Sequence, residues 1–169
     1  MVKRKAKKKA KKTLGRKKRS PEELRQASNH LHYEVWMLEC MAIGIHSGLA
    51  GKSAIHNAFI ESFVIHARVL LDFFYPLKPR PDDVVAIDFC DRAKTWEQAR
   101  PEKTDILKTI QKRVGKEAAH LTYSRQEVSQ EQKHWDHPNI ARDIGVLVDC
   151  FLSVVSNSLL GDRWNKYKK

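Results

Sequence analysis

The sequence predicts an all-α protein, an up-and-down four-helix bundle that follows a basic N-terminal tail. Four segments carry apolar residues at three- and four-residue steps or on most faces, which is typical of α-helices. Residues that favour helix starts and stops lie at the ends of these segments. No two alternating apolar runs indicate a strand pair. A chain of 169 residues is most simply one domain plus a tail, so we expect the bundle over 20–161 and a polar C-terminal end over 162–169.

The tail over 1–19 carries the whole charge excess of the chain. The sequence holds 32 basic and 20 acidic residues, and 12 of the basic ones precede Ser20, where there is no acidic residue. Like charges at this density repel one another and little is apolar, so we expect a disordered tail. Anionic lipid would attract it too, and a solubilising role is the simplest alternative. The residues that we expect to contact nucleic-acid phosphates, without sequence preference, are Lys3, Arg4, Lys5, Lys7, Lys8, Lys9, Lys11, Lys12, Arg16, Lys17, Lys18 and Arg19.

The first helix has a clear start signal. Ser20 is a favourable N-cap, Pro21 fits the first helical position, and Glu23 completes a capping box. Apolar residues then recur on one face, and three glycines predict an end near residue 48.

The second helix is expected from about Ser53 to Tyr75, and it is the element around which the rest of the chain is organised. It is apolar on nearly every side from Glu61 onward, which is typical of the buried member of a bundle. Glu61, Arg68 and Asp72 nevertheless fall in one narrow stripe. Charges on such a helix need partners, so either another element supplies them or Arg68 and Asp72 pair within the helix. A network of this kind can serve a site or only fix helix register.

A long crossover connects the second and third helices. Three prolines enforce a non-helical start to the connection. We expect residues 82–100 to be partly helical and packed on the bundle, with Trp96 among their anchors. The third helix is expected to start near Pro101 or Thr104 and to continue to about Thr122.

The fourth helix is expected to start at Pro138 and to end at Gly161. Its run from Ile144 to Leu160 is apolar on most faces, which is more than one face of a bundle needs to bury. The sequence therefore predicts a homodimer formed through this helix.

Cysteine and histidine spacing excludes the common metal motifs. The three cysteines are isolated, and no histidine or carboxylate lies at a convincing ligand spacing, so we expect no metal and no cofactor. Unpaired cysteines in apolar helical runs favour a reducing compartment. The run from Ile144 to Val155 is too short to span a bilayer, and the lysines of the tail lead into no signal sequence. A soluble cytoplasmic protein is expected, with no membrane partner.

Two residues of the third helix form a candidate catalytic pair. Arg113 and His120 are seven positions apart, so they lie on one side of the helix. A histidine can move protons near neutral pH, and an arginine can hold a phosphate and stabilise developing negative charge. Together they suffice for metal-independent cleavage of RNA, in which the 2′-hydroxyl attacks the adjacent phosphorus. Lys116 lies between the two residues and Arg125 follows them in the sequence. With Glu61, Arg68 and Asp72 they are the expected polar network near the site.

At this point the chain resembles the HEPN superfamily. A four-helix bundle, an arginine and a histidine with six residues between them on a late helix, and a polar stripe on an earlier helix carry the resemblance. It implies an RNA-directed protein, often a metal-independent endoribonuclease that works as a dimer with two motifs across the interface. The residue after the arginine is usually polar in active members, and here it is Val114.

Two functions therefore stay open. The first is a HEPN-like endoribonuclease with Arg113 and His120 at the site and the tail holding RNA. The second is a non-catalytic helical module for binding and dimerisation, whose tail adheres to nucleic acid. Val114 favours the second function. An architectural role for Arg113 and His120 is the plain alternative to catalysis.

Overall fold

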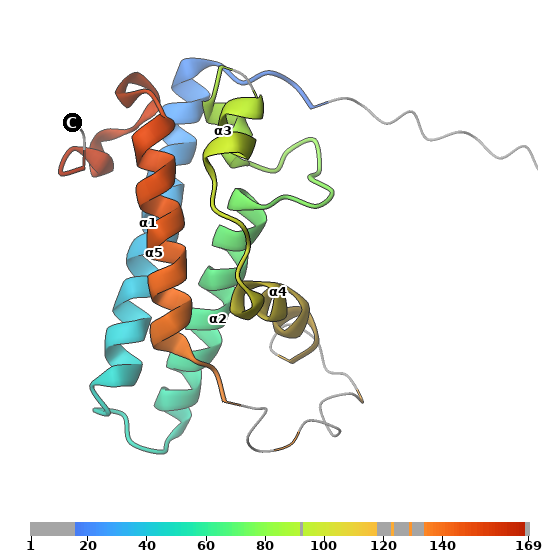
Figure 1. Ribbon diagram of the computed structural model, residues 1–169. Helices are drawn as coiled ribbons and strands as arrows, with labels where there is room; N and C mark the ends of the chain where they lie inside the picture. Colours follow the sequence, from blue (N-terminus) through green and yellow to red (C-terminus); the bar gives the residue numbers. More distant parts are fainter. Residues whose placement is uncertain (1–15, 92, 118–122, 124–128, 130–133, 168–169) are drawn as a thin grey trace, which may run out of the picture.

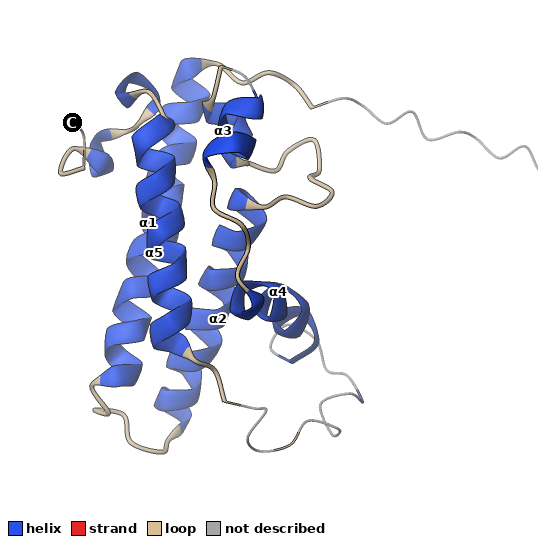
Figure 2. Cartoon of the chain, in the orientation of Figure 1, coloured by secondary structure: helices blue, strands red, loops and turns tan. Residues whose placement is uncertain are grey.

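The structure is a computed structural model that describes residues 16–91, 93–117, 123, 129 and 134–167. Within these residues the secondary structure is entirely helical, which confirms the predicted all-α class (Figure 2). The α-helices are α1 (Pro21–His46), α2 (Ala54–Phe74), α3 (Ala93–Ala99), α4 (Asp105–Glu117) and α5 (His137–Val154). A short 3₁₀ turn at Ala86–Phe89 lies between α2 and α3, and two more at Asn157–Leu159 and Asp162–Trp164 come after α5.

Three long helices lie lengthwise beside one another (Figure 1). α1 runs opposite to α2 and α5, whereas α4 is set across the direction of α2 and packs on it. The core between them includes Phe74, Phe89, Trp96 and Phe151, whose ring centroids lie 5.5–6.1 Å apart where they pair. Aromatic rings at such distances in edge-on or tilted arrangements are favourable beyond the area that they bury.

The start of α1 is the predicted one. The Ser20 hydroxyl accepts a hydrogen bond from the backbone N–H of Glu23, and the Glu23 carboxylate accepts one from the backbone N–H of Ser20. Pro21 occupies the first turn. The helix ends at His46, and Gly48 and Gly51 then take positive φ angles of 65° and 53° in the connection to α2.

α2 is the central helix, and one of its faces stays at the surface. Its buried face includes Phe63, Ala67, Leu70 and Phe74, each 0% exposed. Among the described helices it is also the one long and apolar enough to cross a membrane by length and composition alone. The core helix of a folded domain has the same composition, and the buried face of α2 is such a core.

The crossover is partly helical and packed on the domain, as predicted. It contains one 3₁₀ turn and α3, and within the described residues it has no strand. Trp96 is fully buried, and its indole N–H donates to the carbonyl of Phe74 over 2.9 Å. That bond satisfies a carbonyl at the C-terminal end of α2, where no helical partner is available.

The predicted end of the last helix at Gly161 is wrong, because α5 stops at Val154. Val155 is extended, and the Ser156 hydroxyl accepts a hydrogen bond from Ser158 to start a 3₁₀ turn. Serine side chains offer the backbone such local alternatives to a continued helix. The chain then turns back onto α1, so its last described residues pack on the domain.

Trp164 fixes this C-terminal segment to α1. Its side chain is 1% exposed, and its indole N–H donates to the carbonyl of Ser28 over 2.6 Å. The Ser28 hydroxyl also accepts from the backbone N–H of Gly161 over 2.7 Å. The residues over 162–167 therefore contribute a large aromatic side chain to the core, although their composition is polar.

Candidate nucleic-acid interface

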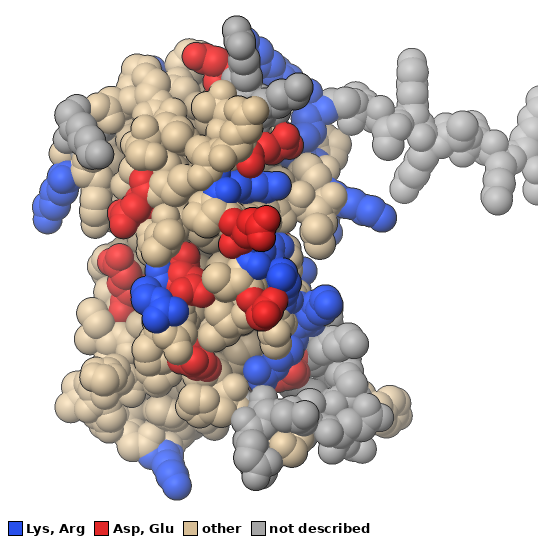
Figure 3. Space-filling model, viewed as in Figure 1, with Lys and Arg blue, Asp and Glu red and all other residues tan. Residues whose placement is uncertain are grey.

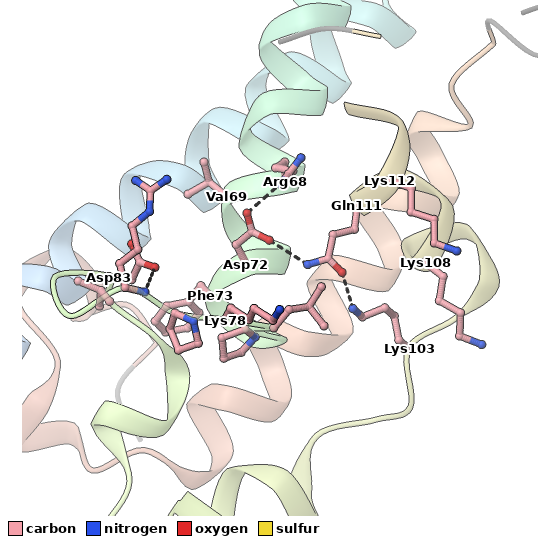
Figure 4. A pocket seen from close by; sticks show the side chains of 15 residues that line it. Arg68, Val69, Asp72, Phe73, Lys78, Asp83, Lys103, Lys108, Gln111 and Lys112 are labelled. Atoms are coloured by element: carbon pink, nitrogen blue, oxygen red, sulfur yellow. Dashed lines mark hydrogen bonds and ion pairs between the residues drawn. The ribbon is translucent and has the colours of Figure 1, made fainter. Parts of the chain in front are cut away.

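A groove of about 850 Å³ lies between the second half of α2, the proline-rich loop over 76–84 and α4. Figure 4 shows Lys103, Lys108 and Lys112 following one another along its α4 side. Positive charge that converges on a concave surface attracts phosphates. Among the described residues, its charged lining consists of Arg68, Lys78, Arg80, Lys103, Lys108 and Lys112, with the carboxylates Asp72 and Asp83.

A hydrogen-bond network crosses the groove from α2 to the start of α4. Arg68 Nε donates to Asp72 Oδ2 over 3.1 Å, and Gln111 Nε2 donates to Asp72 Oδ1 over 2.8 Å. Lys103 Nζ in turn donates to Gln111 Oε1 over 2.7 Å (Figure 4). Both oxygens of Asp72 are thus occupied, and α4 supplies the partner that the charged stripe on α2 was predicted to need.

Lys103 lies near two other cations of this region. Burial lowers the pKa of its ammonium group, and the nearby cations Arg100 and Lys108 lower it further. Its Nζ lies 4.6 Å from the centroid of the Tyr75 ring, which also has Arg100 Cζ at 5.0 Å. A bound anion would relieve the repulsion among these cations.

Several cations of the groove have no carboxylate within ion-pair distance among the described residues. These are Lys78, Arg80, Lys103 and Lys112. Lys108 pairs only with the exposed Asp105 over 2.9 Å, and exposed ion pairs are weak. Phosphate oxygens could therefore bind these side chains without first breaking a buried ion pair.

Described residues at the end of the basic tail contact the same loop. Arg16 donates to the carbonyls of Arg80 and Asp83 over 2.9 and 2.7 Å, and Arg19 donates to the carbonyl of Pro81 over 2.9 Å. The loop that walls the groove therefore also binds Arg16 and Arg19, at the C-terminal end of the tail. Figure 3 shows Lys and Arg side chains gathered on the side of the molecule that carries the groove, with carboxylates between them.

Arg113 contacts Glu117, the Trp135 ring and the carbonyl of His134. Its Nε and one terminal nitrogen donate to the two carboxylate oxygens of Glu117, both over 2.8 Å. Its guanidinium carbon lies 3.9 Å from the centroid of the Trp135 ring. A bidentate pair and a stacked ring fix the guanidinium plane. His120, its expected catalytic partner, lies outside the described residues.

The remaining residues expected near the site lie on α2, on α4 or outside the described residues. Glu61 is exposed on α2, and Arg68 and Asp72 line the groove. Lys116 belongs to α4, and Arg125 lies outside the described residues. Of the expected tail contacts, Arg16, Lys17, Lys18 and Arg19 are described; Lys3, Arg4, Lys5, Lys7, Lys8, Lys9, Lys11 and Lys12 lie outside that part.

Sequence reasoning did not single out Lys103, Lys108 and Lys112. The chain beyond the tail is formally neutral, and this average hides the local excess of cations. Lys108 and Lys112 are four residues apart, so they lie on one helix face, and that spacing was the available signal. The loop residues Lys78 and Arg80 join them only through the fold.

The described residues contain no group of three or more His, Cys, Asp or Glu side chains that could hold a metal ion. No family model, curated protein or solved structure matches this chain.

Proposed function

We propose that this protein binds RNA through contacts with the phosphate backbone, made jointly by the groove and the basic tail. The observation that carries the proposal is the attachment of Arg16 and Arg19 to the loop over 80–83, which also walls the groove. A strand bound in the groove could therefore reach the described end of the tail across this loop. The resemblance to HEPN proteins points to RNA as the nucleic acid.

The contacts of Arg113 favour binding over catalysis. A phosphate clamp must release its guanidinium to the substrate, whereas Arg113 already forms a bidentate pair with Glu117 and stacks on Trp135. Metal-independent cleavage by Arg113 and His120 is the alternative function. The four-helix bundle also stays a proposal, with α1, α2, α4 and α5 as its members.

The homodimer stays a prediction, but α1 and α2 offer a better surface for it than α5 does. Five apolar side chains of α5 are buried in the domain, and among its large hydrophobic residues Val146 alone is exposed, at 51%. Exposed Trp36 and Ile43 on α1 and Ile65 on α2 offer a larger apolar area. Light scattering at micromolar concentration tests the prediction, and a monomer would contradict it.

RNA binding is tested by the fluorescence anisotropy of a labelled single-stranded RNA, with DNA of the same sequence for comparison. The variant Lys78→Glu/Lys112→Glu reverses two unpaired cations of the groove. The matched control is Lys52→Glu, an exposed lysine in the connection between α1 and α2 that does not line the groove. We expect the groove variant to bind at least about tenfold more weakly, and the control to bind like the wild type. Equal effects of the two variants would contradict a role for the groove.

A further inference from the structure

A second cavity, here called the aromatic pocket, shares no lining residue with the groove. It encloses about 610 Å³ between α1, α5 and the C-terminal segment. Trp36 and Tyr167 line it, and these rings are 51% and 47% exposed. Tyr167 packs on the buried ring of Trp164 at a centroid distance of 5.5 Å. Exposed rings on a fixed base of this kind offer flat faces for stacking.

Gly145 opens the wall of this pocket on the α5 side. A glycine inside a helix costs about 0.5–1 kcal/mol relative to alanine, so its presence calls for a reason. The other described glycines have one, either a positive φ or a neighbour within 3.2 Å of an added Cβ atom. At Gly145 an added Cβ atom would meet nothing within 4 Å. The open backbone leaves room for a ligand to approach the helix closely.

The polar side chains of the pocket carry both signs of charge. Glu39 and Asp149 supply carboxylates, and Arg163 and Lys166 supply cations. Glu39 is exposed at this pocket, and desolvation there raises the pKa of its carboxyl group. Burial, and then the charges of Arg163 and Lys166, lower the pKa of His32, which lies beside them. No ion pair joins the carboxylates to these cations among the described residues.

We propose that the aromatic pocket binds a guanine nucleotide, either free or as an unpaired guanosine within RNA. The guanine ring would stack on Trp36 and Tyr167, and its adjacent N1–H and N2–H donors would meet the Glu39 carboxylate. The phosphate would pair with Arg163 and Lys166. A simple cation would satisfy the carboxylates but would be repelled by the two basic side chains. Adenine and cytosine present one donor beside an acceptor on that edge, so a carboxylate selects against them.

The free-nucleotide form of this proposal stands apart from the proposed function, whereas the RNA-borne form rests on it. Isothermal titration calorimetry with GMP, AMP, CMP and UMP tests the first form on the whole chain. We expect GMP to bind at least about tenfold more tightly than AMP, because GMP forms one more charge-assisted hydrogen bond with the Glu39 carboxylate. Millimolar or weaker binding of GMP, equal binding of AMP, or binding of tetramethylammonium in its place would overturn the proposal.

Three variants tie the binding to the pocket. Glu39→Gln should abolish the preference for GMP, whereas Glu97→Gln, an exposed matched control on α3, should keep it. Gly145→Leu should fill the open wall and weaken GMP binding at least about tenfold while the protein stays folded by circular dichroism. Retained preference in Glu39→Gln, or unchanged affinity in folded Gly145→Leu, would place the nucleotide elsewhere and so contradict the proposal.

Oligonucleotides separate this proposal from the proposed function. An oligouridine with one central guanosine should bind more tightly than plain oligouridine, and Glu39→Gln should remove that difference only. The groove variant Lys78→Glu/Lys112→Glu should weaken both oligonucleotides alike. If the wild type binds the two oligonucleotides equally while the groove variant binds both more weakly, the RNA-borne form of the pocket proposal is wrong. If the wild type prefers the guanosine oligonucleotide but the groove variant binds both like the wild type, the role of the groove is wrong.

Discussion

The guanidinium of Arg68 lies against the backbone of Gly115. A Cβ atom added at Gly115 would lie 3.0 Å from Nη1 of Arg68, which is tighter than ordinary van der Waals contact. The glycine therefore lets α4 approach the charged stripe on α2 closely enough for Gln111 to reach Asp72. A residue that looks like an interruption of the helix in the sequence is explained by the packing of α2 and α4.

Gly115→Ala should stabilise the protein less than Gly145→Ala does. Alanine gains about 0.5–1 kcal/mol over glycine inside a helix, and nothing lies near Gly145 to offset that gain. At Gly115 the new methyl group must displace Arg68, so part of the gain is lost. Urea unfolding of both variants measures the difference.

The double variant Arg68→Ala/Gly115→Ala provides the control for this contact. With the guanidinium absent, the alanine at 115 should recover most of the gain seen at 145. Equal effects of the two single variants, with no recovery in the double variant, would contradict the proposed contact between Arg68 and Gly115.

Trp164→Ala should cost about 3–5 kcal/mol of unfolding free energy, because it removes a fully buried aromatic side chain. Lys166→Ala, at an exposed position two residues later, should change stability by about 0.5 kcal/mol or less. Thermal or urea unfolding checks both values. A small effect of Trp164→Ala would mean that the C-terminal segment does not pack on α1 in solution.

Stability should fall as the pH drops from about 7 towards 5, in part because of His137. Burial lowers the pKa of this imidazole below 6.5, and the neighbouring His134 and His46 lower it further. The unfolded chain then binds a proton that the folded chain resists, so the stabilising effect is present above the unfolded pKa and is lost below it. His137→Gln should flatten the dependence of the unfolding free energy on pH.

His30→Gln is the matched control for that experiment, since His30 is exposed on α1. It should leave the pH dependence unchanged. Part of the slope should remain in His137→Gln, because burial also lowers the pKa of His32. An unchanged slope in His137→Gln would show that His137 titrates in the folded protein as it does in the unfolded chain.

Arg113→Ala should destabilise the protein. It should not change ribonuclease activity, because we expect the wild type to have none. The substitution removes the bidentate ion pair with the partly buried Glu117 carboxylate, which costs about 1–3 kcal/mol. Incubation of labelled single-stranded RNA with the wild type in EDTA should give no cleavage. Cleavage that disappears in both Arg113→Ala and His120→Ala, with both variants folded, would instead establish the ribonuclease hypothesis.

Local chemistry made much of the fold predictable from sequence. The capping box of Ser20 and Glu23 involves residues three apart, and the sequence therefore predicts the start of α1 correctly. The end of α5 was missed because Ser156 starts a 3₁₀ turn there, and the chain beyond it is held by contacts of Gly161 and Trp164 with Ser28, more than 130 positions away. Sequence periodicity carries no information about such a contact.

The candidate interface was less predictable than the helices, for a similar reason. The tail is a continuous run, so its charge is visible directly. The groove takes Lys78 from a loop, Lys103 from the segment before α4 and Lys112 from α4 itself. α2 and α4 approach each other closely where Gly115 packs against Arg68, which only the folded chain reveals.

The salt dependence of RNA affinity tests most directly whether the groove and the tail form one binding surface. The proteins to compare are the wild type, the chain lacking residues 1–15, the variant Lys78→Glu/Lys112→Glu, and the combination of both changes. Each lost phosphate contact should reduce the slope of log K against log salt by about 0.7 over roughly 50–200 mM salt. We predict that the deletion and the groove variant each have a smaller slope than the wild type, and that the combination has the smallest slope. A groove variant with the slope of the wild type, both with and without the tail, would contradict the account.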